Sequence, residues 1–145
     1  MAGCAGGLLV IIVAVLTGCS AAAPAPSPVV LAVDCAAFET AAPGGGPVQR
    51  DIAVPVGSTI HVRLCSNAST GFAWEDPTWT GDPAVELSAV ASQDPASPLP
   101  GAAGQQAFAF KAIAAGTTRI DFVYSQPWAG GTKGAWRLAV TVTVG

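Results

Sequence analysis

Charged residues are scarce in this chain, and their scarcity limits what it can bind. Only 10% of its 145 residues are Asp, Glu, Lys or Arg, and the six basic residues are scattered singly. Recognition of nucleic acid needs basic side chains gathered on one face, so we expect no nucleic-acid partner. The apolar fraction of 51% lies far from that of disordered chains. We therefore expect a packed core in one domain.

Residues that carry out chemistry are also few. The single histidine, His61, has no carboxylates clustered near it in the sequence, which argues against a metal site. On one strand, His61 and Cys65 would share a face but lie about 13 Å apart, too far for a catalytic pair. Because no nucleophile, base or metal ligands are grouped, the sequence predicts a protein that is not an enzyme.

Helical periodicity of useful length is missing, whereas short segments of alternating apolar residues recur along the chain. These segments predict strands at 29–35, 50–57, 58–65, 84–90, 106–113, 117–125 and 134–144. Pro55 indicates that the second of them lies at a sheet edge. Seven or so short strands separated by Gly- and Pro-rich turns predict an antiparallel β-sandwich or barrel.

The N-terminus reads as a targeting segment. Leu8–Leu16 is an unbroken apolar run that fits a signal peptide and is too short to cross a bilayer as a helix. The following "LTGC", Leu16 to Cys19, resembles the lipobox of bacterial lipoproteins, in which the chain is cut before the cysteine and the cysteine is lipidated. One departure is that no Lys or Arg precedes the apolar run. A buried apolar helix is the alternative interpretation.

This interpretation divides the chain into three parts. Residues 1–18 are expected to be a lipoprotein signal peptide, and residues 19–28 a lipidated cysteine followed by an Ala/Pro/Ser tether. Residues 29–145 form the folded domain. The expected location is extracytoplasmic, with the chain anchored to the bacterial cell membrane or envelope only through the lipid on Cys19.

Two cysteines remain for the folded domain once Cys4 is removed and Cys19 is lipidated. In an oxidising compartment, Cys35 and Cys65 are expected to form a disulfide. If the apolar residues of the 58–65 strand face inward, Cys65 points outward. The bridge would then need an edge position or a bulge.

Because no strand carries a row of catalytic-type residues, function is expected in the loops. Three segments are unusual. Loop 1, "SNASTGFAW" (66–74), ends in two aromatic residues. Loop 2, "DPASPLPGAAGQQ" (94–106), is rich in Pro and Gly. Loop 3, "SQPWAGGTKG" (125–134), places Trp128 beside Pro127 and several glycines.

Together these loops resemble those of the chagasin family, proteinaceous inhibitors of papain-like cysteine peptidases. The family's first loop reads N-P-T-T-G-[FY]-x-W, which corresponds here to Asn67, Ala68, Ser69, Thr70, Gly71, Phe72, Ala73 and Trp74. Its second loop resembles G-x-G-G before a Phe-x-Phe strand, here Gly101, Ala102, Ala103 and Gly104, then Phe108 and Phe110. Its third resembles Y-x-R-P-W, here Tyr124, Ser125, Gln126, Pro127 and Trp128. The order and spacing match over roughly residues 29 to 144.

The chain departs from the family pattern at three loop positions. Ala68 replaces a proline, Ala103 replaces a glycine, and Gln126 replaces an arginine, which removes a charged donor. The Cys35–Cys65 pair is not part of the family pattern either. The three loop replacements are expected to weaken inhibition or to change which peptidase is preferred.

The resemblance implies an immunoglobulin-like antiparallel β-sandwich of about seven to eight strands that acts as a monomer and needs no cofactor. It also implies that the three loops cluster at one end and enter the active-site cleft of a papain-like cysteine peptidase. The small residues of loop 1 would approach the catalytic pair, while Phe72 and Trp74 would fix the loop to the domain. Trp128 would be a second contact, and Gly101 to Gly104 would bring backbone close to the cleft wall.

A second function stays open from the sequence. The chain could be a non-inhibitory β-sandwich module of an envelope lipoprotein that binds a polymer or another envelope protein. In either case Trp74 and Trp136 are predicted to be core residues. Trp128, in a Gly-rich loop, is predicted to be an exposed contact residue.

Overall fold

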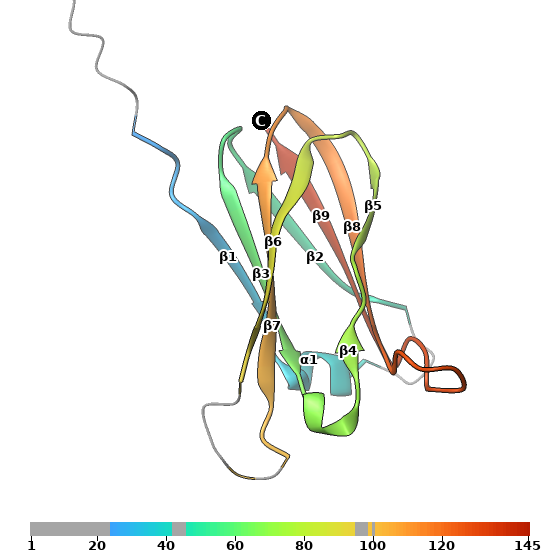
Figure 1. Ribbon diagram of the computed structural model, residues 1–145. Coiled ribbons are helices and arrows are strands. Elements are labelled where there is room, and N and C mark those ends of the chain that lie inside the picture. The colour runs from blue at the N-terminus through green and yellow to red at the C-terminus, as the bar shows by residue number, and fades with distance from the viewer. Residues whose placement is uncertain (1–23, 42–45, 95–98, 100) are drawn as a thin grey trace, which may run out of the picture.

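The computed structural model describes residues 24–41, 46–94, 99 and 101–145, and within them two β-sheets pack face to face (Figure 1). The first sheet has the order β1-β3-β7-β6, formed by Val29–Val33, Thr59–Ser66, Gly104–Ala112 and Val85–Gln93. The second has the order β2-β9-β8-β4, formed by Val48–Val54, Trp136–Val144, Gly116–Ser125 and Ala73–Trp74. A short strand β5, Thr78–Gly81, also pairs with β8.

The predicted one-domain β-sandwich is confirmed, and every predicted strand is present. The pairing differs at two edges, where β1 runs parallel to β3 and β2 runs parallel to β9. Neither pair is joined by a hairpin turn, so no turn forces the antiparallel direction there. β2 lies at a sheet edge and ends at Val54, directly before Pro55, which agrees with the predicted edge.

The core is built from alternate residues of the strands, as the period of two predicts. Phe108 and Phe110 of β7 contact Phe122 of β8 across the sandwich, with ring centroids 5.1 and 6.2 Å apart. The fully buried apolar residues around them are Ile60, Val62, Leu64, Ile120, Leu138, Val140 and Val142. This continuous core holds both sheets rigidly and gives the loops a fixed base.

A short helix, α1 (Cys35–Glu39), was not predicted. The predicted first strand stops at Val33, and the Asp34 side chain accepts a hydrogen bond from the Ala37 amide at 3.0 Å, which caps the helix. One turn is too short to show helical periodicity in a sequence. Its buried residue, Phe38, is only 3% exposed.

The predicted disulfide between Cys35 and Cys65 is confirmed, with the two Cα atoms 5.2 Å apart. β1 ends opposite Leu64, so β3 has no neighbour on that side at Cys65 and is locally an edge. The chain turns into α1 at this point and carries Cys35 across. Cys65 is buried although it follows a core residue, and the bridge places Cys35, the first residue of α1, against its side chain.

Two predictions fall on residues outside the described ranges. The signal peptide (1–18) and the lipidation site Cys19 lie there, and so does the start of the tether. Residues 24–28 are described and form neither helix nor strand. Among the residues that the structure describes, no helix is long and apolar enough to cross a membrane.

The disulfide gives the first testable prediction. Replacing both Cys35 and Cys65 by Ser should lower the free energy of unfolding by about 3–4 kcal/mol, because the bridge restricts the unfolded chain. Urea unfolding of the oxidised protein and of the double variant measures the difference. Equal midpoints and slopes for the two proteins would contradict this expectation.

Candidate functional site

The ends of loop 1, loop 3 and the described part of loop 2 lie at the same end of the sandwich (Figure 1). Loop 1 contains a single 3-10 turn, η1 (Ala68–Thr70), and leads into β4. Loop 3 connects β8 to β9, and the described end of loop 2 leads into β7. Helix α1 lies at this same end, nearer the strands than the turn of loop 1 (Figure 1). The turns that join β2 to β3 and β7 to β8 lie at the opposite end.

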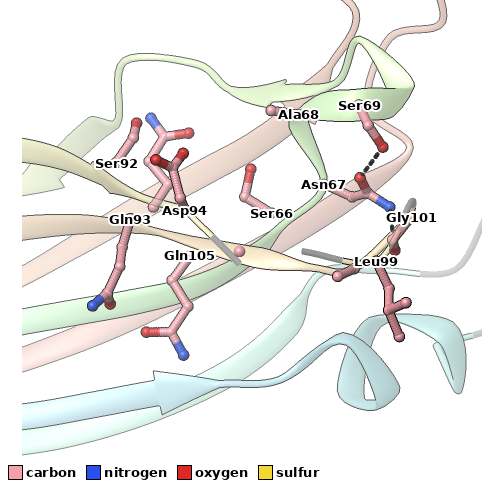
Figure 2. Close-up of a pocket in the computed structure, with 13 residues that line it drawn as sticks. Ser66, Asn67, Ala68, Ser69, Ser92, Gln93, Asp94, Leu99, Gly101 and Gln105 are labelled. Atoms are coloured by element: carbon pink, nitrogen blue, oxygen red, sulfur yellow. Dashed lines mark hydrogen bonds between the residues drawn. The ribbon is translucent and has the colours of Figure 1, made fainter. Parts of the chain in front are cut away.

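Asn67 connects loop 1 to loop 2. Its side-chain Nδ2 donates to the Gly101 carbonyl at 3.2 Å, and its Oδ1 accepts from the Ser69 hydroxyl at 2.6 Å (Figure 2). Its backbone carbonyl accepts from the Thr70 amide at 3.1 Å and from the Thr70 hydroxyl at 2.6 Å. One residue therefore shapes the 3-10 turn and fixes it to the neighbouring loop.

Loop 1 also contacts loop 3. The Gln126 Nε2 donates to the Thr70 carbonyl at 3.4 Å. Gly71 has a φ of +76°, and the Trp128 indole lies against it so closely that a Cβ at position 71 would meet Trp128 Cη2 and, at 2.9 Å, Cζ3. Gly71 is thus required by its backbone conformation and by its contact with loop 3.

Gln126, which stands where the family has arginine, joins the two ends of loop 3 by hydrogen bonds within the loop. Its side-chain Oε1 accepts from the Thr132 backbone amide at 3.0 Å, and its backbone amide donates to the Thr132 carbonyl at 2.8 Å. The Lys133 ammonium donates to the Gln126 carbonyl. Trp128, held at the turn of this closed loop, is 50% exposed. The prediction that Trp128 is exposed is confirmed.

Five rings form an aromatic cluster beneath the loops: Phe38, Phe72, Trp74, Tyr124 and Trp136. Tyr124 lies at its centre, with ring centroids 5.4 Å from Phe72, 4.9 Å from Trp74 and 4.8 Å from Trp136. The Tyr124 hydroxyl accepts from the Asn67 amide at 2.8 Å. Phe72 and Trp74 thus fix loop 1 to the domain, as predicted.

Gln106 is a site residue that the sequence reasoning missed. Its Oε1 accepts from the Trp74 amide at 3.2 Å, and its Nε2 donates to the Trp74 carbonyl at 3.3 Å. Because Gln106 is on β7 and Trp74 on β4, this side chain joins the two sheets at the base of loop 1. Its position two residues before Phe108, on the inward face of the strand, is the signal that could have identified it.

A hollow of about 480 Å³ lies beside loop 1, between that loop and the ends of β6 and β7 (Figure 2). Its walls are mainly small or polar, with Ala68, Ser69 and Ser92 on opposite sides and Asp94 at the β6 end. The hollow leaves one flank of loop 1 open.

The charged side chains of Asp94 and Lys133 lie near the loop end but are not among the predicted contact residues. None of the predicted contact residues in the three loops has a charged side chain. The Arg119–Asp121 pair lies on β8, and the hydrogen bonds and charge of Asp121 raise the pKa of Arg119. In the described part of the chain, no three His, Cys, Asp or Glu residues gather as metal ligands.

The contact between Gly71 and Trp128 gives a second prediction. Gly71→Ala should displace the Trp128 indole, and the left-handed backbone should cost about 1–2 kcal/mol in addition. Gly101→Ala is the matched control, because Gly101 has a similar φ of +83° but nothing within 4 Å of an added Cβ. The NMR signal of the Trp128 indole N–H should shift only in the Gly71 variant. An unmoved signal would show that the contact is absent.

Comparison with known proteins agrees with this geometry. The model of the family "Chagasin family peptidase inhibitor I42" matches residues 53–144. Chagasin from Trypanosoma cruzi is 34% identical over 92 residues, which cover 61% of this chain and 84% of that protein.

Two solved structures share the fold. The cysteine protease inhibitor EhICP2 from Entamoeba histolytica has a TM-score of 0.59 at 21% identity, covering 85% of this chain and 100% of that chain. PbICP-C, solved in complex with falcipain-2, has a TM-score of 0.57 at 19% identity, covering 81% and 99%. The family match spans all three loops and begins after α1. This chain therefore belongs to the chagasin family of peptidase inhibitors.

Proposed function

We propose that this protein inhibits papain-like cysteine peptidases reversibly, by inserting loops 1, 2 and 3 together into the active-site cleft. The observation that carries the proposal is that the three loops are fastened to one another at one end of the sandwich. Asn67 binds Gly101, Gln126 binds Thr70, and Trp128 lies on Gly71. The fold of PbICP-C, a similar structure that was solved in complex with falcipain-2, supports it.

The backbone of loop 1 explains how the tip could enter a peptidase without being cut. In η1 the amides of Thr70 and Gly71 donate to the carbonyls of Asn67 and Ala68, at 3.1 and 3.0 Å. The chain is therefore curled and internally hydrogen-bonded, whereas a peptide substrate must lie extended to pair with a cleft. Ser69, Thr70 and Gly71 are small enough to approach the catalytic residues in this form.

The tip is ordered before binding. The aromatic cluster holds Phe72 and Trp74 from below, and the loop-to-loop hydrogen bonds hold the sides. Each side chain that need not be immobilised on association avoids a cost of about 0.5–1.5 kcal/mol. A stiff wedge therefore binds more tightly than a flexible loop with the same contacts.

Trp128 is the side chain that we expect to contribute most to affinity. It is half exposed, rests on Gly71, and follows Pro127, which restricts the loop backbone. A large aromatic group that is already held in place is the usual form of an interface hot spot. Its indole would lie on one wall of the cleft, while the Gly101–Gly104 backbone would approach the other.

The third prediction concerns inhibition. The mature chain, residues 19–145 carrying Cys19→Ser to prevent lipidation, should inhibit papain tightly and reversibly in a titration. Trp128→Ala should raise the inhibition constant by about 30-fold, which corresponds to a hot-spot loss of about 2 kcal/mol. The Gly71→Glu variant should inhibit papain more weakly still, because the introduced glutamate side chain would collide with the Trp128 ring. Thr143→Ala, on the exposed face of β9, should inhibit like the wild type.

Two outcomes would contradict this proposal at different levels. If papain and cathepsin L both keep full activity, the non-inhibitory envelope module becomes the better account. If the wild type inhibits and both loop variants inhibit equally well, the loops are not the contact surface.

We also propose that the protein acts as a monomer held to the bacterial envelope by a lipid on Cys19, as the "LTGC" segment at 16–19 predicts. In a bacterial host that processes lipoproteins, the full chain should partition into the detergent phase of Triton X-114. Mass spectrometry of the mature wild type should find Cys19 as the lipid-bearing first residue, whereas the Cys19→Ser variant should keep residues 1–18 and carry no lipid. A lipid-free wild type, or a lipid on the variant, would contradict the assignment of Cys19.

A further inference from the structure

Helix α1 lies outside the segment that matches the family model, yet it completes the support of the loops. Its one buried side chain, Phe38, enters the aromatic cluster. The Phe38 ring stacks on Trp136 at a centroid distance of 5.2 Å and an angle of 14°, and it lies 5.2 Å from Trp74. Both partners contact Tyr124, which holds loop 1 through Phe72 and Asn67.

Helix α1 is attached to the sandwich by the Phe38 ring, by the partly buried Ala37 that packs against the core, and by the disulfide. In the part of the chain that the structure describes, the hydrogen bonds of α1 stay within residues 34–41. The helix has one turn, which is not stable in isolation. The Cys35–Cys65 bridge is the covalent link that joins it to the sheet.

The bridge joins β3 at the base of loop 1. Cys65 lies two residues before Asn67, and its carbonyl accepts from the Trp74 indole Nε1 at 2.9 Å. The side chain of Cys65 thus holds α1, while its backbone holds the Trp74 ring against which Phe38 packs. The covalent bond and the aromatic contact therefore support the same loop from the same point.

We propose that Phe38 is a positioning residue for the inhibitory loops, and that the Cys35–Cys65 disulfide keeps it in the aromatic cluster. Reduction of the bridge then weakens peptidase binding while the sandwich stays folded. A dithiol supplies two electrons and two protons, the Sγ–Sγ bond breaks, two thiols form, and the dithiol closes to a cyclic disulfide. This inference rests on the proposed inhibitory function.

The first experiment uses the mature chain with Cys19→Ser and compares three variants. Phe38→Ala should raise the inhibition constant for papain at least tenfold, while Phe38→Leu should restore most of the affinity. Ile60→Ala, a fully buried residue on β3 at the end away from the loops, is the control for lost stability. It should lower the melting temperature comparably and leave the inhibition constant unchanged. Equal inhibition constants for Phe38→Ala and Ile60→Ala would overturn the proposal.

The second experiment tests the bridge. Papain is activated with dithiothreitol and freed of it by desalting, so that the oxidised inhibitor keeps its disulfide during the assay. The pair Cys35→Ser and Cys65→Ser should raise the inhibition constant as much as Phe38→Ala. Adding Phe38→Ala to that pair should weaken inhibition no further, because both changes act through α1. Fully additive effects would show that the bridge does not act through Phe38.

A third measurement separates failure of this inference from failure of the inhibitory function. Hydrogen exchange at the Thr70 and Gly71 amides reports the order of η1 without any peptidase. Exchange should be faster in Phe38→Ala and in the double serine variant than in Ile60→Ala. If exchange is equal in all of them, the positioning role is wrong even where papain is inhibited. If papain is not inhibited but exchange responds as expected, only the proposed function fails.

Discussion

The contacts of Tyr124 are the constraint on which the loop end depends. This residue lies on the last inward position of β8, directly before loop 3, and it is almost fully buried. Its ring stacks on Phe72, its hydroxyl accepts from Asn67, and its carbonyl accepts from the Ala135 amide at the end of loop 3. The side chain of Tyr124 therefore fixes the base of loop 1, and its backbone carbonyl fixes the C-terminal end of loop 3. Loops 1 and 3 are thus held at their bases by the same residue.

Much of the fold could be predicted from the sequence, because alternate apolar residues record which side of each strand faces the core. The seven predicted strands and the edge position before Pro55 follow from that pattern alone. The parallel direction of β1 and β2 does not, since it depends on which distant strand each joins. The single turn of α1 leaves no period in the sequence. Without α1, the burial of Cys65 had no explanation either.

The candidate site was predicted as a set of loops, but the contacts within it were not. Motif spacing identified Gly71 and Trp128 separately, whereas their mutual contact depends on how loops from β3 and β8 meet in space. From the sequence, Gln126 was interpreted only as the loss of the charged donor that the family's arginine provides. In the structure its carboxamide closes loop 3 by a hydrogen bond with Thr132. Gln106 carried a readable signal, a polar residue on the inward face of β7. Such a residue needs a buried partner, but sequence alone does not name it.

The parallel pairing of β1 with β3 places the start of β1 at the end of the sandwich away from the loops (Figure 1). β1 begins beside the first residues of β3, and Pro26 of the tether lies near Gly57 in the turn at the end away from the loops. If the lipid is on Cys19, the ten residues 19–28 would join it to the folded domain. These residues span at most about 35 Å when extended. The wedge would then point away from the bilayer, toward enzymes that diffuse in from outside. Peptidases embedded in the same membrane would be poorly placed to meet it.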